Sequence, residues 1–209
     1  MTEPKHDPPM HLPAFFVKQK LTLMVNRYEI RSAGPDGQPG ELMAVAQQKR
    51  MAFKEQVTFY ADEERTRPVF SFKARQVVDL NAGYDVFDEH GEAIGFFRKD
   101  FGKSLLRSTF HLNGPHGLNA IGQERNQAIA IIRRFVDFPF AFHFDFVEQG
   151  QSDFVEQGQS AIAQERQPVM HVDRQFSLRD RYAVTVPDRR LDFRLAAAMT
   201  VALDALMSR

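Results

Sequence analysis

The feature that most constrains the fold is the C-terminal segment from Leu191 to Met207, which is apolar on nearly its whole circumference when plotted as a helix. A helix that is apolar nearly all round has to be buried on nearly all sides. The segment is shorter than the roughly 20 apolar residues of a transmembrane span, and it carries Asp192, Arg194 and Asp204. We therefore expect a core helix enclosed by other elements, and no transmembrane segment.

Most other apolar residues alternate with polar ones at a period of two, which is typical of strands. In the first run the apolar residues Val17, Leu21, Leu23 and Val25 share one face of the predicted strand. The polar residues Lys18, Lys20 and Thr22 share the other face. Further runs contain Phe70, Phe72, Ala74, Val78 and Leu80, then Phe140, Phe142, Phe144 and Phe146, then Phe176, Leu178, Tyr182, Val184 and Val186. Strands with one apolar face predict an antiparallel sheet covering a core.

Turn residues support hairpins between such strands. The segment 84–87 runs into Asp88-Glu89-His90-Gly91 and returns as 93–97, and glycine favours the positive φ of a tight turn. A second hairpin is expected from Tyr28-Glu29-Ile30 through a Gly/Pro-rich loop at 33–40 to 42–46. The shared Tyr-x-aliphatic pattern is either a repeated hairpin or a coincidence common in strands.

Two other segments stand apart from the strand pattern. Between Gln123 and Phe135 the apolar residues fall at helical spacing, which predicts one short surface helix. The sequence DFVEQGQS at 145–152 is repeated without change at 153–160, which indicates a short duplication tolerated in a surface loop. We expect 150–160 to be mobile and without a functional role.

The size and composition fit one globular domain. The chain has 209 residues, of which 43% are hydrophobic and 26% charged. Residues 1–13 are polar and proline-rich without an apolar stretch, so we expect a disordered lead-in before a single domain at 14–209, and no signal peptide. Cysteine is absent, which excludes disulfides and fits a cytoplasmic protein. Basic and acidic residues number 27 each, so no global field attracts nucleic acid.

Three stretches together resemble the LURP-one-related and phospholipid scramblase-like family of the tubby-like C-terminal domain superfamily. They are FVKQKLTLMVNRYEI near the start, YDVFDEHGEAIGFFRK in the middle and LDFRLAAAMTVALDAL at the end. The resemblance implies a closed antiparallel barrel of about twelve strands around a hydrophobic C-terminal helix at about 191–207. It also suggests a peripheral lipid-binding role, while the pattern of elements contains no catalytic signature.

Enzymatic and metal-binding chemistry has little support in the sequence. His143 and Asp145 lie two residues apart on one strand face, as either a ligand pair or a His–Asp hydrogen bond. The acidic residues at the 84–97 hairpin do not match a calcium loop; they are Asp85, Asp88, Glu89 and Glu92. No phosphate-binding loop, dinucleotide motif or G-x-S-x-G occurs. We therefore predict a protein without catalytic residues, metal or cofactor.

The lipid-binding prediction rests on a basic stretch after the central hairpin. Arg98, Lys99, Lys103 and Arg107 are interleaved with apolar residues, as a headgroup patch beside inserting side chains would be. The alternative interpretation of these four residues is a solvated rim. We expect the barrel to bind an anionic phospholipid surface through this stretch. The alternative function is a scaffold that binds a protein partner and neither lipid nor substrate.

Overall fold

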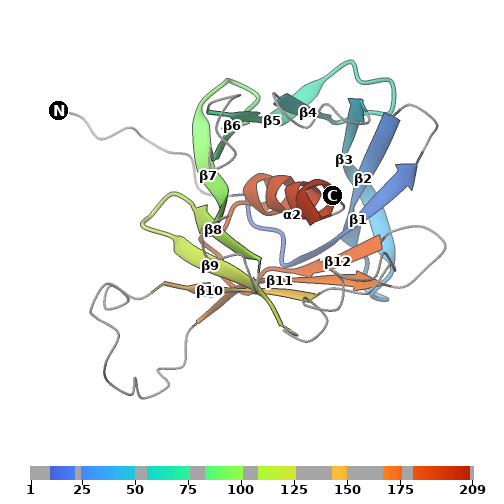
Figure 1. The fold of residues 1–209 in the computed structure, drawn as a ribbon. Coiled ribbons are helices and arrows are strands. Elements are labelled where there is room, and N and C mark those ends of the chain that lie inside the picture. Colours follow the sequence, from blue (N-terminus) through green and yellow to red (C-terminus); the bar gives the residue numbers. More distant parts are fainter. Residues whose placement is uncertain are drawn as a thin grey trace, which may run out of the picture.

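The structure is a computed structural model that describes residues 10–21, 25–49, 56–75, 83–100, 108–125, 143–149, 167–175 and 181–207. In these residues twelve antiparallel strands close into one barrel around one helix (Figure 1). The strands are β1 Ala14–Leu21, β2 Val25–Ala33, β3 Pro39–Lys49, β4 Gln56–Tyr60, β5 Pro68–Ala74, β6 Tyr84–Asp88, β7 Ala93–Asp100, β8 Thr109–Asn113, β9 Asn119–Glu124, β10 His143–Glu148, β11 Pro168–Gln175 and β12 Arg181–Thr185. The helix, α2, spans Phe193–Met207. The expected mainly β barrel with an enclosed C-terminal helix is confirmed.

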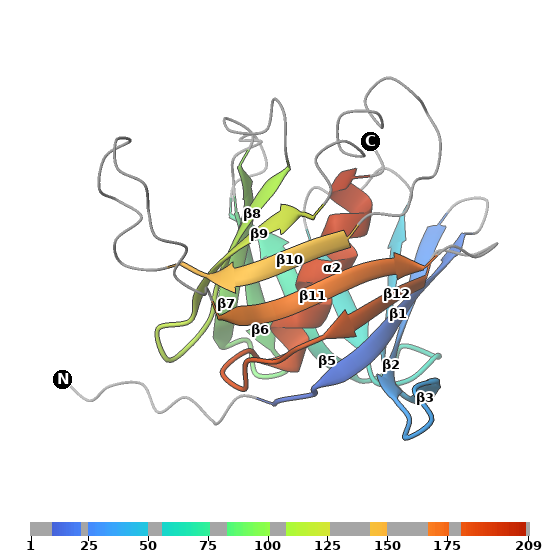
Figure 2. The ribbon, with the colours of Figure 1, turned by 90° about the horizontal axis from the view of Figure 1, so that it is seen from below.

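Each strand pairs with its neighbours in the sequence, and β1 pairs with β12 to close the barrel (Figure 2). Both expected hairpins are present, as β2 with β3 and β6 with β7. In the second hairpin Gly91 has a φ of 82°, a value that glycine adopts without strain. Because neighbouring strands follow one another along the chain, most of the sheet forms from local pairings, and only the β1–β12 contact joins the two ends.

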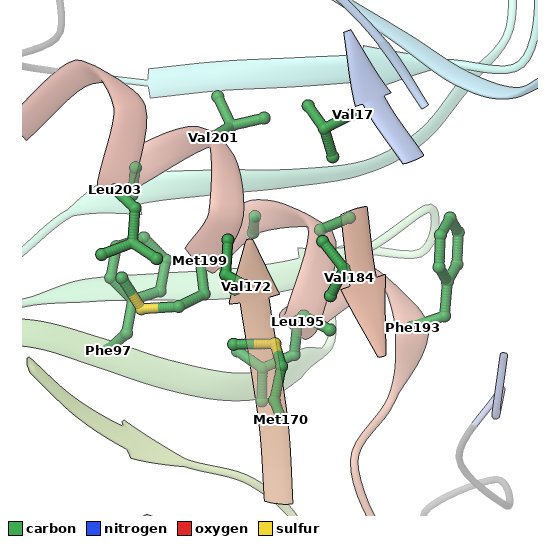
Figure 3. Close-up of a cluster of buried hydrophobic side chains, with 14 of the residues drawn as sticks. Val17, Phe97, Met170, Val172, Val184, Phe193, Leu195, Met199, Val201 and Leu203 are labelled. Carbon is green, nitrogen blue, oxygen red and sulfur yellow. The ribbon is translucent and has the colours of Figure 1, made fainter. Parts of the chain in front are cut away.

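The core consists of side chains that alternate into the barrel and meet α2. Figure 3 shows strand residues such as Phe97, Met170 and Val172 gathered around Leu195, Met199 and Leu203 of the helix. Gly95 of β7 permits this approach, because a Cβ there would lie 2.4 Å from the Leu195 Cδ2 atom and 2.8 Å from the Asn113 carbonyl oxygen. Eleven of the α2 residues from Phe193 to Asp204 are buried, so the helix occupies the centre of the barrel.

Asp192 fixes the N-terminal end of α2. Its backbone oxygen accepts the first helical hydrogen bond, from Ala196 at 3.0 Å, and its carboxylate accepts one from the Arg194 backbone N–H at 2.8 Å. The Arg194 side chain donates to both carboxylate oxygens, at 3.0 and 2.9 Å, which raises the pKa of its guanidinium. Met10 also donates its backbone N–H to this carboxylate at 3.0 Å. Residues from both ends of the chain are thus tied together at this end of the barrel.

A buried polar cluster lies near the C-terminal end of α2. The Tyr28 hydroxyl donates to one oxygen of Asp204 at 2.8 Å and the Tyr182 hydroxyl to the other. All three side chains are buried, and Gln19 donates to the Tyr28 hydroxyl at 3.4 Å. Burial and the adjacent carboxylate of Asp204 raise the pKa of Tyr28 far above its usual value. The cluster attaches the helix to β2 and β12 with a defined rotation about its axis.

Some expected boundaries differ from the structure. The prediction that the alternating residues 17–25 form one strand is wrong. The strand β1 ends at Leu21 and β2 begins at Val25, and Leu21 pairs with Asn26 across the two strands. The alternation continues across this reversal without a glycine or proline to mark it. The start of the predicted surface helix is also wrong, because Gln123 belongs to β9 and pairs with Thr109. The rest of that helix lies outside the described residues.

Several other predictions fall partly outside the described residues. Of the expected lead-in at 1–13, Pro13 accepts a backbone hydrogen bond from Val186 at 2.8 Å, while 1–9 are not described. The first copy of the duplicated segment begins in β10 at Asp145. The second copy and the expected mobile loop at 150–160 are outside the described residues.

Candidate functional site

The outer face of β12, β1 and β2 carries a cavity of about 210 Å³, which we call the basic groove. Its lining residues come from neighbouring strands and from the start of β3; they are Phe16, Lys18, Glu29, Arg31, Pro39 and Arg181. Their direction follows from strand alternation, because Val17, Tyr28 and Tyr182 next to them are buried in the core. Three cationic side chains and one aromatic ring therefore converge on the outside of the barrel.

The two strands that close the barrel place like charges opposite each other in this groove. Lys18 of β1 is the cross-strand partner of Arg181 of β12. Like charges directly opposite in an antiparallel pair destabilise the sheet. In the described part of the chain neither Lys18 nor Arg181 forms an ion pair with a carboxylate. This arrangement leaves two positive charges available to an anionic ligand.

Glu29 lines the groove, and its side chain is 3% exposed. It is the cross-strand partner of Lys18 on the side away from Arg181. One carboxylate oxygen forms an ion pair with Lys20, and the other lies 3.9 Å from the Arg31 Nε atom. Arg31 also donates from Nη1 to the Gly40 carbonyl oxygen at 3.1 Å. These contacts hold Arg31 at the groove in a fixed orientation.

The residues predicted from the sequence to bind lipid are divided between two faces of β7. Arg98 is exposed on the outer face, whereas Lys99 points into the barrel, as adjacent residues of a strand must. The Lys99 Nζ atom donates to the Leu206 carbonyl oxygen at 3.1 Å and lies 5.7 Å from the Phe110 ring. Phe97, the apolar residue next to Arg98 in the sequence, is in the core. Lys103 and Arg107 are outside the described residues.

Lys99 contributes a structural contact at the end of the helix. No basic residue occurs in the last turn of α2, so Lys99 provides the positive charge that favours a helix C-terminus. We expect Lys99→Met to lower the free energy of unfolding by about 1 kcal/mol, measured by urea denaturation. Arg98→Met, at the neighbouring exposed position, should leave it unchanged. Equal effects of the two substitutions would contradict the assignment.

The basic groove and Arg98 lie on opposite sides of the barrel. In the closed strand order β7 is six strands away from β1 in both directions, and Figure 1 shows the two strands facing each other across α2. A flat surface that contacts the outer face at one of these places cannot contact it at the other. The two locations are therefore competing candidates for the same function.

His143 and Asp145 do not pair with each other but with residues of β11. The His143 Nδ1 atom is hydrogen-bonded to Asp173 at 2.6 Å, and the His171 Nδ1 atom to Asp145 at 2.7 Å. Arg125 donates to both oxygens of Asp145, at 2.8 and 2.6 Å. The partner in the sequence-based interpretation is thus corrected, because the opposite strand brings a carboxylate nearer than the same strand does.

This cluster predicts an acid-dependent contribution to stability. The hydrogen bonds from Arg125, followed by that from His171, lower the pKa of Asp145 from 3.8 to about 2. The folded state therefore gains stability above about pH 4, and this gain is lost as the pH falls toward 2. We expect the loss to be about 1 kcal/mol after allowance for solvent screening. Urea unfolding at a series of pH values measures this loss. Asp145→Asn should reduce the dependence of the free energy of unfolding on pH between about 4 and 2, and an unchanged dependence would contradict the assignment.

Three of the acidic hairpin residues, Asp85, Asp88 and Glu89, contact other groups of the protein. Asp85 forms a bidentate pair with Arg75, at 2.9 and 2.7 Å. Asp88 accepts backbone hydrogen bonds within the turn, and Glu89 lies 3.4 Å from Arg194. Among the described residues no group of three or more His, Asp or Glu side chains is arranged to hold a metal ion.

The architecture defines the class of protein: a closed antiparallel barrel that encloses a hydrophobic C-terminal helix, consistent with the tubby-like superfamily. The sequence model of the LURP-one-related family matches residues 42–204, and the chain belongs to this family. No curated protein and no solved structure matches the chain. Within the described residues no helix has the length and apolar character needed to cross a membrane.

The basic groove was not predictable from the sequence. The outward positions of Lys18 and Lys20 were visible in the alternation, and both are on the outer face of β1. The third strand of the groove, β12, comes from the other end of the chain, and no sequence signal places Arg181 beside Lys18. The basic residues near Arg98 were predicted as the binding site instead, because they are close together in the sequence.

Proposed function

We propose that this barrel is a non-catalytic module that binds the surface of anionic phospholipid membranes through the basic groove. The observation that supports the proposal is the cross-strand pair of Lys18 and Arg181, two cations kept opposite each other without a carboxylate between them. Such an arrangement costs stability, and a bound phosphate would remove that cost by charge-assisted hydrogen bonds.

The surroundings of the pair suit a headgroup at a membrane surface. Arg31 adds a third cation, and Phe16 and Pro39 supply an apolar wall beside it. Phe16 lies on the outer face and is only partly buried, so its ring is available to the interfacial region of a bilayer. Because basic and acidic residues are equal in number, attraction to an anionic surface has to come from a local patch of this kind. The proposal places the protein in the cytoplasm with peripheral attachment.

Co-sedimentation with vesicles tests the proposal. The protein should bind vesicles of phosphatidylcholine mixed with phosphatidylglycerol at low salt, and should not bind phosphatidylcholine alone. Binding should weaken as salt is added, because screening shortens the range of the attraction. Absence of binding to any anionic vesicle at low salt would refute the proposal and favour the alternative function, a scaffold that binds a protein partner.

Arg181→Glu locates the binding surface. We expect it to weaken vesicle binding by about tenfold or more, since each basic residue near an anionic surface contributes about 1 kcal/mol. The same substitution places an opposite charge beside Lys18, so thermal stability should be retained or increased. Arg98→Glu is the matched control on the opposite side of the barrel and should bind like the wild type. The reverse result would assign binding to the stretch containing Arg98, Lys103 and Arg107.

A further inference from the structure

We infer that the basic groove recognises the phosphoserine headgroup, which carries a phosphate, an ammonium and a carboxylate, in preference to other anionic headgroups. The inference rests on the proposed membrane-binding function and names the ligand class of the same groove. The observation behind the inference is the buried carboxylate of Glu29 in the groove. A site that binds only anions would not need a negatively charged side chain.

The charges of the groove follow a defined order across three paired strands. Arg181 is opposite Lys18, and Lys18 is opposite Glu29. Neighbouring strands lie about 4.8 Å apart. Two positive residues, Arg181 and Lys18, are therefore followed by the negative Glu29 at successive strand spacings. A phosphate between Arg181 and Lys18 leaves the rest of its headgroup over Glu29. There the Glu29 carboxylate, which also contacts Lys20 and lies near Arg31, offers an acceptor for an ammonium group.

Glu29 retains capacity to accept hydrogen bonds from such a group. Lys20 pairs with one of its oxygens, while Arg31 Nε lies 3.9 Å from the other, a separation too long for a hydrogen bond. A carboxylate can accept at about four positions. The Lys20 side chain is 37% exposed, so it can share or yield the carboxylate without being forced into the core. An ammonium group fits this second oxygen.

Arg31 provides the third element of the match. It lies two residues from Glu29 on the same face of β2, a separation of roughly 7 Å along the strand. Its Nη1 atom donates to the Gly40 carbonyl oxygen, which fixes the guanidinium at the groove. The phosphoserine headgroup carries its ammonium and its carboxylate on one carbon. With the ammonium at Glu29, the carboxylate therefore faces Arg31, whose planar fork suits carboxylates.

Other common headgroups satisfy only part of this pattern. Phosphatidylglycerol and phosphatidic acid supply the phosphate but no ammonium for Glu29. Phosphatidylethanolamine supplies phosphate and ammonium but no carboxylate for Arg31. We therefore expect the groove to prefer phosphatidylserine to phosphatidylglycerol. Net charge alone would not produce this preference, because both headgroups carry one net negative charge.

The test measures vesicle binding at matched mole fractions of phosphatidylserine or phosphatidylglycerol in phosphatidylcholine, for wild type and Glu29→Gln. We expect the wild type to prefer phosphatidylserine by about tenfold, the size of one charge-assisted hydrogen bond. Glu29→Gln should remove the preference, so that the ratio of phosphatidylserine binding to phosphatidylglycerol binding falls to about one. Glycerophosphoserine should compete with vesicles for the wild type, and its failure to do so would show that a free headgroup does not suffice and refute headgroup recognition.

The outcomes separate this inference from the proposal on which it rests. Equal binding to both anionic vesicles, reduced by Arg181→Glu, would refute the preference for phosphoserine while keeping membrane binding. Binding to neither would refute both. Should Glu29→Gln fold poorly, Arg31→Gln provides a second test, because it should lower binding to phosphatidylserine more than to phosphatidylglycerol. A uniform reduction for both lipids would also refute the inference.

Discussion

Removal of residues 191–209 is expected to abolish cooperative unfolding of the protein. These residues include all of α2, whose buried side chains fill the centre of the barrel. Without them the inward faces of the strands would surround an open apolar space, and the loss of several large core side chains far exceeds the stability of a typical domain. Thermal denaturation followed by circular dichroism, together with dye binding, measures this directly.

The expected state of the truncated chain is insoluble or molten, with exposed apolar surface and no fixed packing. Truncation at residue 207, which removes only Ser208 and Arg209, is the matched control and should unfold like the full chain. A soluble 1–190 fragment with a sharp thermal transition would contradict the role of α2 as the core of the barrel.

Asp204→Ala is expected to lower the free energy of unfolding by roughly 3 kcal/mol. The substitution leaves the buried hydroxyls of Tyr28 and Tyr182 without the carboxylate to which both donate. A buried donor that loses its acceptor retains the cost of its removal from water. Chemical denaturation by urea, with the slope compared between variants, measures the effect.

Replacement of all three side chains should behave differently from removal of the Asp204 carboxylate alone. In the variant with Asp204→Leu, Tyr28→Phe and Tyr182→Phe no buried polar group of the three remains. Buried polar clusters replaced by apolar residues of similar volume are often neutral or stabilising. We therefore expect this triple variant to be closer to the wild type than Asp204→Ala is. A triple variant less stable than Asp204→Ala would show that the cluster contributes net stability.

The fold was largely predictable because its elements are marked locally. Period-two alternation identified parts of β1, β5, β10 and β12, and turn residues identified the hairpins β2–β3 and β6–β7. Other strands lacked a clear signal: β4, β8, β9 and β11 are short or contain polar residues at half of their positions. Their existence depends on pairing with neighbours, which stabilises a strand whatever its local pattern.

The candidate site was less predictable, for the same physical reason. The stretch near Arg98 attracted the prediction because basic residues follow one another there, but strand alternation sends Lys99 to the end of α2. The basic groove is assembled from strands at opposite ends of the sequence. Residues that are far apart in the chain acquire a common site only when the barrel closes.

The sequence by itself determined that the C-terminal segment is a buried helix, since an apolar circumference leaves no face for solvent. It also determined that antiparallel strands with one apolar face surround that helix. Only the tertiary structure decided which outward residues meet, because cross-strand pairing depends on register and not on composition. That register places Lys18 between Arg181 and Glu29 and so creates the groove to which we assign the function.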